Sequence, residues 1–304
     1  MRRFFSSLIF SSVLLSFSAC HHKTNEIVLK HTLPLGCDYY SLKSAQCQGL
    51  EQMPSKLEPY KVIFIGDHHT QPNLHKDVAK LIMELAKNGT KVHLANEWFY
   101  PRDEKVLNAY TTNEINETEF IEQIQWEKRL KYYPYTSFQP MYQAIKKTQG
   151  KLHGINLTKK EQKKISDQNL SAMTQDERIF NASLDLNISA HKGMVLPFLS
   201  HCHAPKTGES LQECSQRMYR VQVAWDTKMA NEAYNLSLKL QQNEKLIVFA
   251  GAMHMENSLG IPLHFARLSN QPTVNITPAD TADRELEHGT SDYVLLYSDT
   301  QAKE

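Results

Sequence analysis

Short apolar runs alternate along this chain with longer segments of helical pattern, and this alternation constrains the fold more than any other feature. Each run is short for a helix but long enough for a buried β-strand. Between the first two runs, the segment LHKDVAKLIMELAKNG at 74–89 has apolar residues at helical spacing and ends on a glycine. The runs are VIFI at 62–65, VHLA at 92–95, LHGINL at 152–157, MVLPFLS at 194–200, LIVFA at 246–250, TVNIT at 273–277 and YVLLY at 293–297.

Two further helical segments are expected, at roughly 158–190 and 210–242. Strands that alternate with helices predict an α/β fold with a largely parallel central sheet and helices on both faces. The length of chain beyond residue 59 suits a single domain, in which the helix-rich middle is a candidate subdomain.

The first twenty residues, MRRFFSSLIFSSVLLSFSAC, have the layout of a bacterial export signal, with two arginines, an apolar core and small residues before a cysteine. The stretch is too short to cross the roughly 30 Å hydrocarbon core of a membrane as a helix. The last four residues, ending at Cys20, resemble a lipobox, although an ordinary secreted protein cleaved nearby is the alternative. We therefore expect a lipoprotein signal peptide at 1–19, a lipidated N-terminus and linker at 20–59, and one α/β domain at 60–304.

The charge of the chain argues against a nucleic-acid partner. Lys and Arg number 34 against 33 Asp and Glu, and no basic block carries interleaved aromatic residues. The remaining cysteines, Cys37, Cys47, Cys202 and Cys214, fall into two local pairs, which suggests two disulfides in an oxidising periplasm. Free thiols, or a single bridge, are the alternatives.

Polar side chains follow the predicted strands where each strand ends. His69 follows the first run, Glu97 the second and His254 the LIVFA run, and both histidines belong to a G-x-x-H motif that begins at Gly66 or Gly251. Because ligands of open α/β sheets bind outside the carboxyl ends of the strands, we expect these groups to converge on one crevice. The same argument extends to Asn156, His201 and His203.

Several stretches together resemble the ChaN family of haem-binding lipoproteins, within the wider group of Tiki, TraB and erythromycin esterase proteins. They extend from about residue 60 to residue 278 and read FIGDHHTQPNLH, HLANEWF, WEKRLKYYPYTSFQPMY, QVAWDTKMA and FAGAMHMENSLGIPLHFAR. The family usually has glutamate after the first glycine, where this chain has Asp67. The aspartate side chain is one methylene shorter than that of glutamate, which affects any role that depends on how far the carboxylate reaches.

The resemblance implies a lipid-anchored protein of the outer membrane that takes part in iron acquisition and binds ferric haem between two subunits. A tyrosine would ligate the iron, because a hard phenolate favours Fe(III). The stretch KYYPYTSF offers Tyr133 and Tyr135, which the sequence does not separate and which could both be packing aromatics. His203 and Lys206 would hold the propionates from the facing subunit, and an outer-membrane haem receptor is an expected partner.

The Tiki-like and esterase-like relatives support a different hypothesis. His69, Glu97 and His254 could hold a divalent metal with a water in the open position, and Asp67 or His68 could act as base. The alternative is a buried hydrogen-bond network that orients loops without any chemistry.

Gln222, Trp225 and Asp226 lie at helical spacing and by default form a packed helix face, although they could instead support the crevice. Trp98, beside Glu97, is expected to be a wall of the crevice. On balance the sequence favours a haem carrier without catalytic turnover, with the metal-dependent hydrolase second and a periplasmic interaction protein third.

Overall fold

The computed structural model describes residues 29–34, 36–202, 205–282, 285–288 and 291–298. Its centre is a mixed sheet in the order β3-β2-β10-β8-β4-β7-β5-β6, in which the strands from β10 to β6 run parallel and β2 and β3 are antiparallel additions at one edge. The strands are β2 (Tyr39–Ser41), β3 (Gln46–Gln48), β4 (Val62–Asp67), β5 (Lys91–Asn96), β6 (Leu152–Gly154), β7 (Glu244–Gly251), β8 (Thr273–Asp280) and β10 (Tyr293–Tyr297). The predicted α/β fold with a largely parallel sheet is confirmed.

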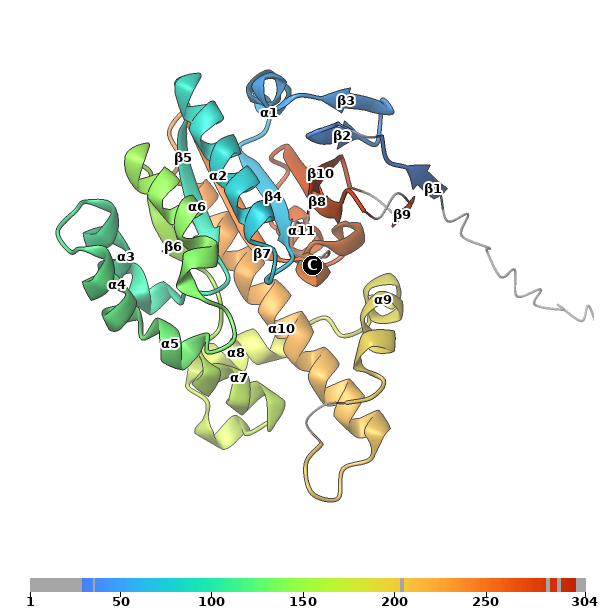
Figure 1. The fold of residues 1–304 in the computed structure, drawn as a ribbon. Helices are drawn as coiled ribbons and strands as arrows, with labels where there is room; N and C mark the ends of the chain where they lie inside the picture. Colours follow the sequence, from blue (N-terminus) through green and yellow to red (C-terminus); the bar gives the residue numbers. More distant parts are fainter. Residues whose placement is uncertain (1–28, 35, 203–204, 283–284, 289–290, 299–304) are drawn as a thin grey trace, which may run out of the picture.

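Helices cover both faces of this sheet (Figure 1). On one face lie α2 (Pro72–Lys87) and α6 (Tyr135–Lys147), which pack against each other, and on the other lie α10 (Leu211–Ser237) and α11 (Ile261–Ala266). All six residues of β4 are buried, because its side chains alternate between the two apolar cores. A central parallel strand covered on both faces therefore reads as a continuous apolar run.

The remaining elements lie around this core. Among the described residues, no helix is long and apolar enough to span a membrane. A two-stranded sheet pairs β1 (Leu29–Thr32) with β9 (Glu285–His288). The other helices are η1 (Leu50–Gln52), α1 (Met53–Leu57), η2 (Pro101–Asp103), α3 (Glu104–Thr111), α4 (Glu117–Ile124), α5 (Trp126–Arg129), α7 (Lys159–Ser166), η3 (Leu170–Ala172), α8 (Gln175–Ala182), α9 (Ser189–Leu199), η4 (Ala252–His254) and η5 (Glu256–Ser258).

The expectation of a strand at 194–200 is wrong, because this run lies in helix α9. Pro197 cannot donate to a strand ladder, and Val195 packs instead on Tyr219 and Val223 of α10. Consequently His201 does not follow a strand, and the argument that brought it to the crevice does not hold.

The helical segment expected at 158–190 is not one continuous helix: α7, the short η3 and α8 divide it, and α9 begins only at Ser189. Thr158 and Thr174 each begin a helix with a capping box, in which a glutamate three residues later bonds back to the cap. These caps start new helices inside the segment and divide it.

Part of the segment expected to be linker belongs to the sheet. Strands β2 and β3 extend its edge beyond β10, and a disulfide between Cys37 and Cys47 joins the hairpin they form. Tyr39 is 1% exposed, so the hairpin contributes to the core although its sequence has no long apolar run. Local pattern alone missed it because its partner, β10, lies more than 200 residues away along the chain.

Candidate functional site

Three strands that are neighbours in the sheet deliver the polar groups predicted to converge. Strand β7 lies between β4 and β5, so the residues that follow these strands meet at one edge. Glu97 lies between the two histidines: its Oε1 is 3.5 Å from His69 Nε2, and its Oε2 is 3.6 Å from His254 Nε2. We call Asp67, His69, Glu97 and His254 the strand-end site.

Gly251 makes room for both imidazole rings. A Cβ at this position would lie 2.9 Å from His69 Cε1 and 3.6 Å from His254 Cδ2. A side chain would therefore collide with the His69 ring and displace it. The glycine of the second G-x-x-H motif is required by this close approach.

A buried aspartate orients the first histidine. Asp67 accepts a hydrogen bond from His69 Nδ1 at 2.8 Å and a second from His75 Nε2 at 2.7 Å. His75 is fully buried, and its Nδ1 lies 2.9 Å from Ser137 Oγ. Burial alone would raise the pKa of Asp67, but the hydrogen bonds from the two histidines outweigh it, and the pKa is lowered. Asp67 is thus ionised, and its hydrogen bond from Nδ1 orients His69 so that Nε2 faces Glu97.

A second buried aspartate, Asp226 of α10, does the same for His254. It accepts a hydrogen bond from His254 Nδ1, and its other oxygen lies 3.2 Å from His191 Nε2. The amide of Gln222 lies 2.9 Å from the same His254 nitrogen. The default interpretation of Gln222 and Asp226 as a packed helix face is therefore wrong, because both side chains turn toward the strand ends.

Sequence reasoning did not identify His191. It named Asp226 only as an alternative; the signal in favour of that alternative is the place of Asp226 among Val223, Ala224 and Met229, since an acidic residue inside an apolar helix face needs a buried partner.

Glu97 is the exception among these acids. It is 6% exposed, and within the part of the chain that the structure describes its Oε1 has no hydrogen-bond partner. Burial raises the pKa of Glu97, and the nearby His69 and His254 lower it by less, so the pKa is raised overall. A buried carboxylate between two imidazole nitrogens, with one oxygen that accepts no hydrogen bond from the described residues, has the character of a ligand site.

The donor set suits a divalent metal. Atoms of Asp67, His69 and Glu97 lie within 4.8 Å of one another. Both oxygens of Asp67 already accept hydrogen bonds, whereas His254 Nε2 faces Glu97, so we take His254 as the third donor in place of Asp67. Each histidine would then present Nε2 to the metal while a carboxylate holds Nδ1, the usual support for a metal-bound histidine.

Aromatic rings form one wall beside the strand-end site. The ring of Trp98 lies 4.6 Å from that of His69, and the ring of Tyr133 lies 5.3 Å from His69 and 5.2 Å from Trp98. Tyr133 is half-buried, and its hydroxyl has no hydrogen-bond partner among the described residues. The haem-ligand candidate and the strand-end site are therefore neighbours, which the sequence did not reveal.

Tyr135 has a different environment. It is 5% exposed, and its hydroxyl lies 3.3 Å from both the Tyr110 hydroxyl and Glu117 Oε2. Burial raises the pKa of Tyr135 far above its usual value, with smaller contributions from Tyr110 and Glu117 in the same direction. A buried, protonated phenol is a poor haem ligand, so the structure favours Tyr133.

The other predicted residues are spread more widely. His68 turns away from the site and places its Nδ1 2.8 Å from the Tyr297 hydroxyl, which does not suit a base acting at Glu97. Lys206 is exposed and pairs with Asp167 at 2.6 Å. Asn156 donates to the backbone carbonyl of Glu97 at 3.2 Å and so supports the loop after β5.

Of the remaining predicted residues, Cys20 and His203 lie outside the described residues, and disulfides join Cys37 to Cys47 and Cys202 to Cys214.

Comparisons with known proteins agree with the fold and give the family. The family model described as haem-binding uptake, Tiki superfamily, ChaN matches residues 53–265. A structure described as cofacial haem binding to ChaN of Campylobacter jejuni is 19% identical, covers 86% of this chain and 96% of its own, and has a TM-score of 0.68. No curated protein matches the chain.

Two weaker likenesses are to the type III effector HopBA1 and to a mutant of erythromycin esterase EreC in its open conformation. The first is 16% identical over 83% of this chain and 94% of its own, with a TM-score of 0.48. The second is 13% identical over 80% of this chain and 77% of its own, with a TM-score of 0.44.

Replacing Glu97 by glutamine should stabilise the protein at pH 7. Because the folded-state pKa of Glu97 is raised from 4.5, the fold favours the protonated acid, and stability is lost as the pH rises through that pKa. The neutral amide removes this cost, so urea unfolding at pH 7 should show a gain of about 1 kcal/mol that vanishes toward pH 4.

Glu213→Gln is the control for this measurement. Hydrogen bonds from the backbone and hydroxyl of Ser210 lower the pKa of Glu213, so this variant should gain nothing at pH 7. A loss of stability in Glu97→Gln would mean that His69 and His254 hold the ionised carboxylate more strongly than burial opposes it.

Proposed function

Because the chain belongs to the ChaN family of haem-binding uptake proteins, we propose that it carries ferric haem at the cell envelope, with Tyr133 as the iron ligand. The observation that carries this proposal is the position of Tyr133, half-exposed with an unpartnered hydroxyl among the described residues, on an aromatic wall with Trp98. A haem needs one hard oxygen ligand and flat apolar surface beside it, and these two side chains offer both.

Other side chains of this wall fit the same ligand. Trp98 Nε1 is buried without a hydrogen-bond partner among the described residues, and His69 is partly exposed beside Tyr133. Bound haem would supply an Fe(III) centre that a phenolate oxygen prefers, while the protein holds the phenol in place and covers one face. Carriage requires no turnover, so the proposal assigns no catalytic step to these residues.

A second copy of the chain completes the proposed site. Tyr133 packs against Trp98 and His69 and is partly exposed, so a facing subunit can cover a haem bound there. Lys206 and His203 of that second copy remain the candidates for the propionates. Lys206 is exposed enough for this contact, but it would have to leave its bond to Asp167.

Tyr133→Phe should lower the affinity for haemin by at least about 100-fold, because it removes the iron ligand. Haemin titrated into the chain from residue 21 onward, followed by absorbance and sedimentation, should show a high-spin ferric spectrum and a shift from monomer to dimer. Tyr135→Phe is the matched control: it should leave haem affinity unchanged and cost about 1 kcal/mol of stability through lost hydrogen bonds. Equal affinities for wild type and Tyr133→Phe would reject this ligand.

We further propose that acyl chains at Cys20 anchor the protein to the outer membrane, because the leader resembles a lipoprotein signal. Several acyl chains give stable attachment, whereas one alone gives marginal binding. In cell fractionation the full chain should therefore sediment with membranes, and Cys20→Ser should move it to the soluble fraction. If the variant stays with the membranes, the anchor lies elsewhere.

A metal-dependent hydrolase remains the second candidate, and one observation favours it: two imidazole Nε2 atoms face the buried carboxylate of Glu97 at 3.5 and 3.6 Å. A divalent ion held there would activate a water, with these three side chains as its ligands.

This second candidate makes a separate prediction about metal content. The wild-type protein should retain about one zinc or manganese ion per chain after dialysis, and His254→Ala should bind the ion at least about tenfold more weakly. His153→Ala, which removes a histidine paired with Glu104 outside the site, is the control. Wild-type protein without stoichiometric metal would leave the strand-end site as a purely structural network.

A further inference from the structure

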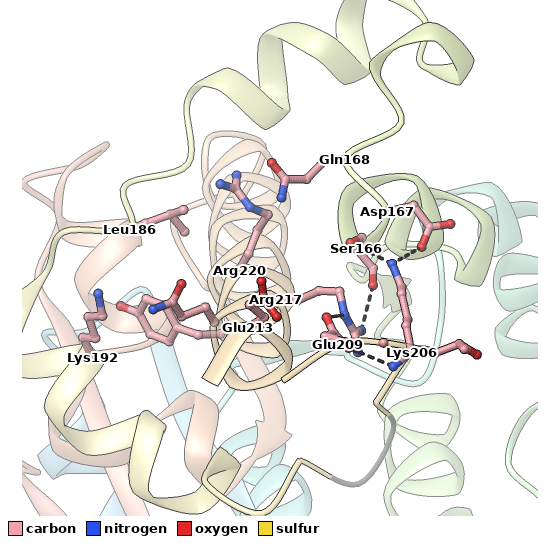
Figure 2. A pocket seen from close by; sticks show the side chains of 14 residues that line it. Ser166, Asp167, Gln168, Leu186, Lys192, Lys206, Glu209, Glu213, Arg217 and Arg220 are labelled. Atoms are coloured by element: carbon pink, nitrogen blue, oxygen red, sulfur yellow. Dashed lines mark hydrogen bonds and ion pairs between the residues drawn. The ribbon is translucent and has the colours of Figure 1, made fainter. Parts of the chain in front are cut away.

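A cleft of about 630 Å³ opens between the end of α7, helix α9 and the first half of α10 (Figure 2). Its volume lies in the range of pockets that bind small molecules. Four cationic side chains line it, which are Lys192, Lys206, Arg217 and Arg220. Two of these cations form ion pairs with carboxylates of the protein, and two do not among the described residues.

Two of the cations are already paired. Lys206 Nζ lies 2.6 Å from Asp167 Oδ1, and Arg217 donates to both oxygens of Glu209, at 2.7 and 2.9 Å. Arg217 also donates to Ser166 Oγ at 3.1 Å. These bonds attach the loop before α10 to the end of α7, and they form one wall of the cleft.

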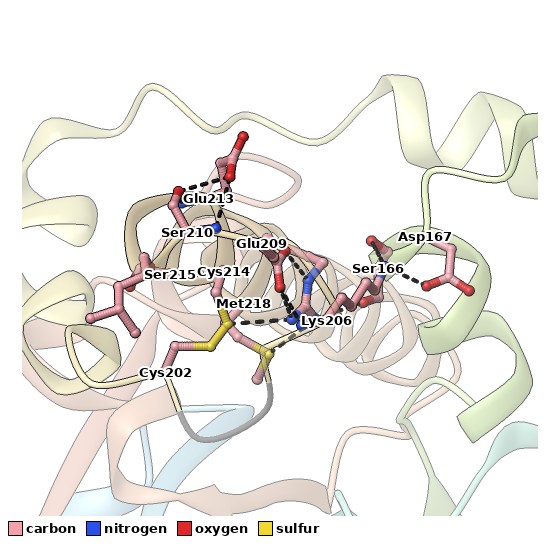
Figure 3. A network of polar contacts seen from close by, with 12 residues as sticks. Ser166, Asp167, Cys202, Lys206, Glu209, Ser210, Glu213, Cys214, Ser215 and Met218 are labelled. Carbon is pink, nitrogen blue, oxygen red and sulfur yellow. Dashed lines mark hydrogen bonds and ion pairs between the residues drawn. A yellow bond between two sulfur atoms is a disulfide. The ribbon is translucent and has the colours of Figure 1, made fainter.

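A disulfide also connects this wall of the cleft to α10 (Figure 3). It joins Cys202 to Cys214, so the loop that carries Lys206 and Glu209 is closed onto the first turn of α10. Arg217 Nη2 lies 3.4 Å from Cys214 Sγ, which places the paired guanidinium against this bridge. The paired cations thus have a structural role.

The other two cations have no such role. Within the described part of the chain, neither Lys192 nor Arg220 has an ion pair; the ammonium of Lys192 lies 6.0 Å from the ring centroid of Tyr219. His191 and Tyr219, the residues just before them, are buried and lie 3.2 Å apart, Nδ1 to hydroxyl. This contact holds α9 against α10, so the two half-buried cations line one cleft from two helices.

The acidic residues of the cleft do not neutralise this pair. Asp167 and Glu209 hold the structural cations, and Glu213 accepts hydrogen bonds from the Ser210 backbone and hydroxyl at 2.9 and 2.7 Å. Gln168 and Gln216 add amide groups, and in Figure 2 the Arg220 side chain points toward Gln168. The lining thus carries four cations and three carboxylates, and among the described residues Lys192 and Arg220 are the cations of the cleft without an ion pair.

We propose that this cleft binds a carboxylate-bearing ligand, with Arg220 and Lys192 holding the carboxylate. The arginine fork matches a carboxylate in shape, and the lysine adds a second charge from the opposite helix. The ligand is either a porphyrin, through its propionates, or a free small polycarboxylate. The proposal rests on the proposed function only in naming the porphyrin.

Metal-free protoporphyrin IX, its dimethyl ester and citrate are the probes, each titrated into the chain from residue 21 onward. Protoporphyrin has no iron for Tyr133 to ligate, so the dependence of its binding on Arg220 and Lys192 reports on the cleft. Arg220→Gln and Lys192→Gln should each weaken binding of the carboxylate ligand by roughly tenfold, since each removes a charge-assisted bond. Lys239→Gln is the charge-matched control, because Lys239 is exposed in the turn that follows α10. This variant should have no effect on binding.

The probes also separate the two sources of carboxylate. If protoporphyrin binds, the ester does not, and both variants lose binding, the ligand is a porphyrin. If citrate binds with the same dependence and protoporphyrin does not, the ligand is a small polycarboxylate. Binding of any probe that is equal in wild type, Arg220→Gln and Lys192→Gln, or no binding at all, overturns the proposal. A loss of haemin binding that is seen only in Tyr133→Phe would not contradict the carboxylate proposal.

Discussion

The two buried aspartates that hold His69 and His254 on either side of Glu97 form the network on which the rest of the structure depends. Charges removed from water must be paired, because an uncompensated buried charge costs several kcal/mol. Asp67 is paired with His69 and His75, and Asp226 with His254 and His191. The chain of alternating imidazoles and carboxylates fixes the loops after β4, β5 and β7 relative to helix α10.

This network also explains why a haem carrier would keep a site that resembles a metal centre. Tyr133 and Trp98 pack against His69, whose ring orientation is fixed by Asp67. The network therefore positions the aromatic wall even if no metal enters it. In this view the buried charges provide a rigid support, and the exposed edge of the wall provides the ligand surface.

The helices beyond the sheet form the cleft rather than the strand-end site. Helices α7 and α9 and the first half of α10 extend past the strand ends (Figure 1). Their residues line the cleft that holds Lys192 and Arg220. Yet α10 joins both regions, because Asp226 reaches His254 while Tyr219, two turns earlier, contacts His191 at the cleft. One long helix thus sets the positions of two groups of polar side chains.

Sequence alone determined the parallel sheet and the meeting of His69, Glu97 and His254, because buried central strands must be apolar and parallel strands end at one edge. It did not determine the hairpin of β2 and β3, since that pairing depends on a distant strand. Nor did it assign Asp226, His191 or the surroundings of Tyr133 and Tyr135. Those roles depend on which side chains meet across helices distant in sequence, and contacts of that kind leave no local pattern, so only the tertiary structure decided them.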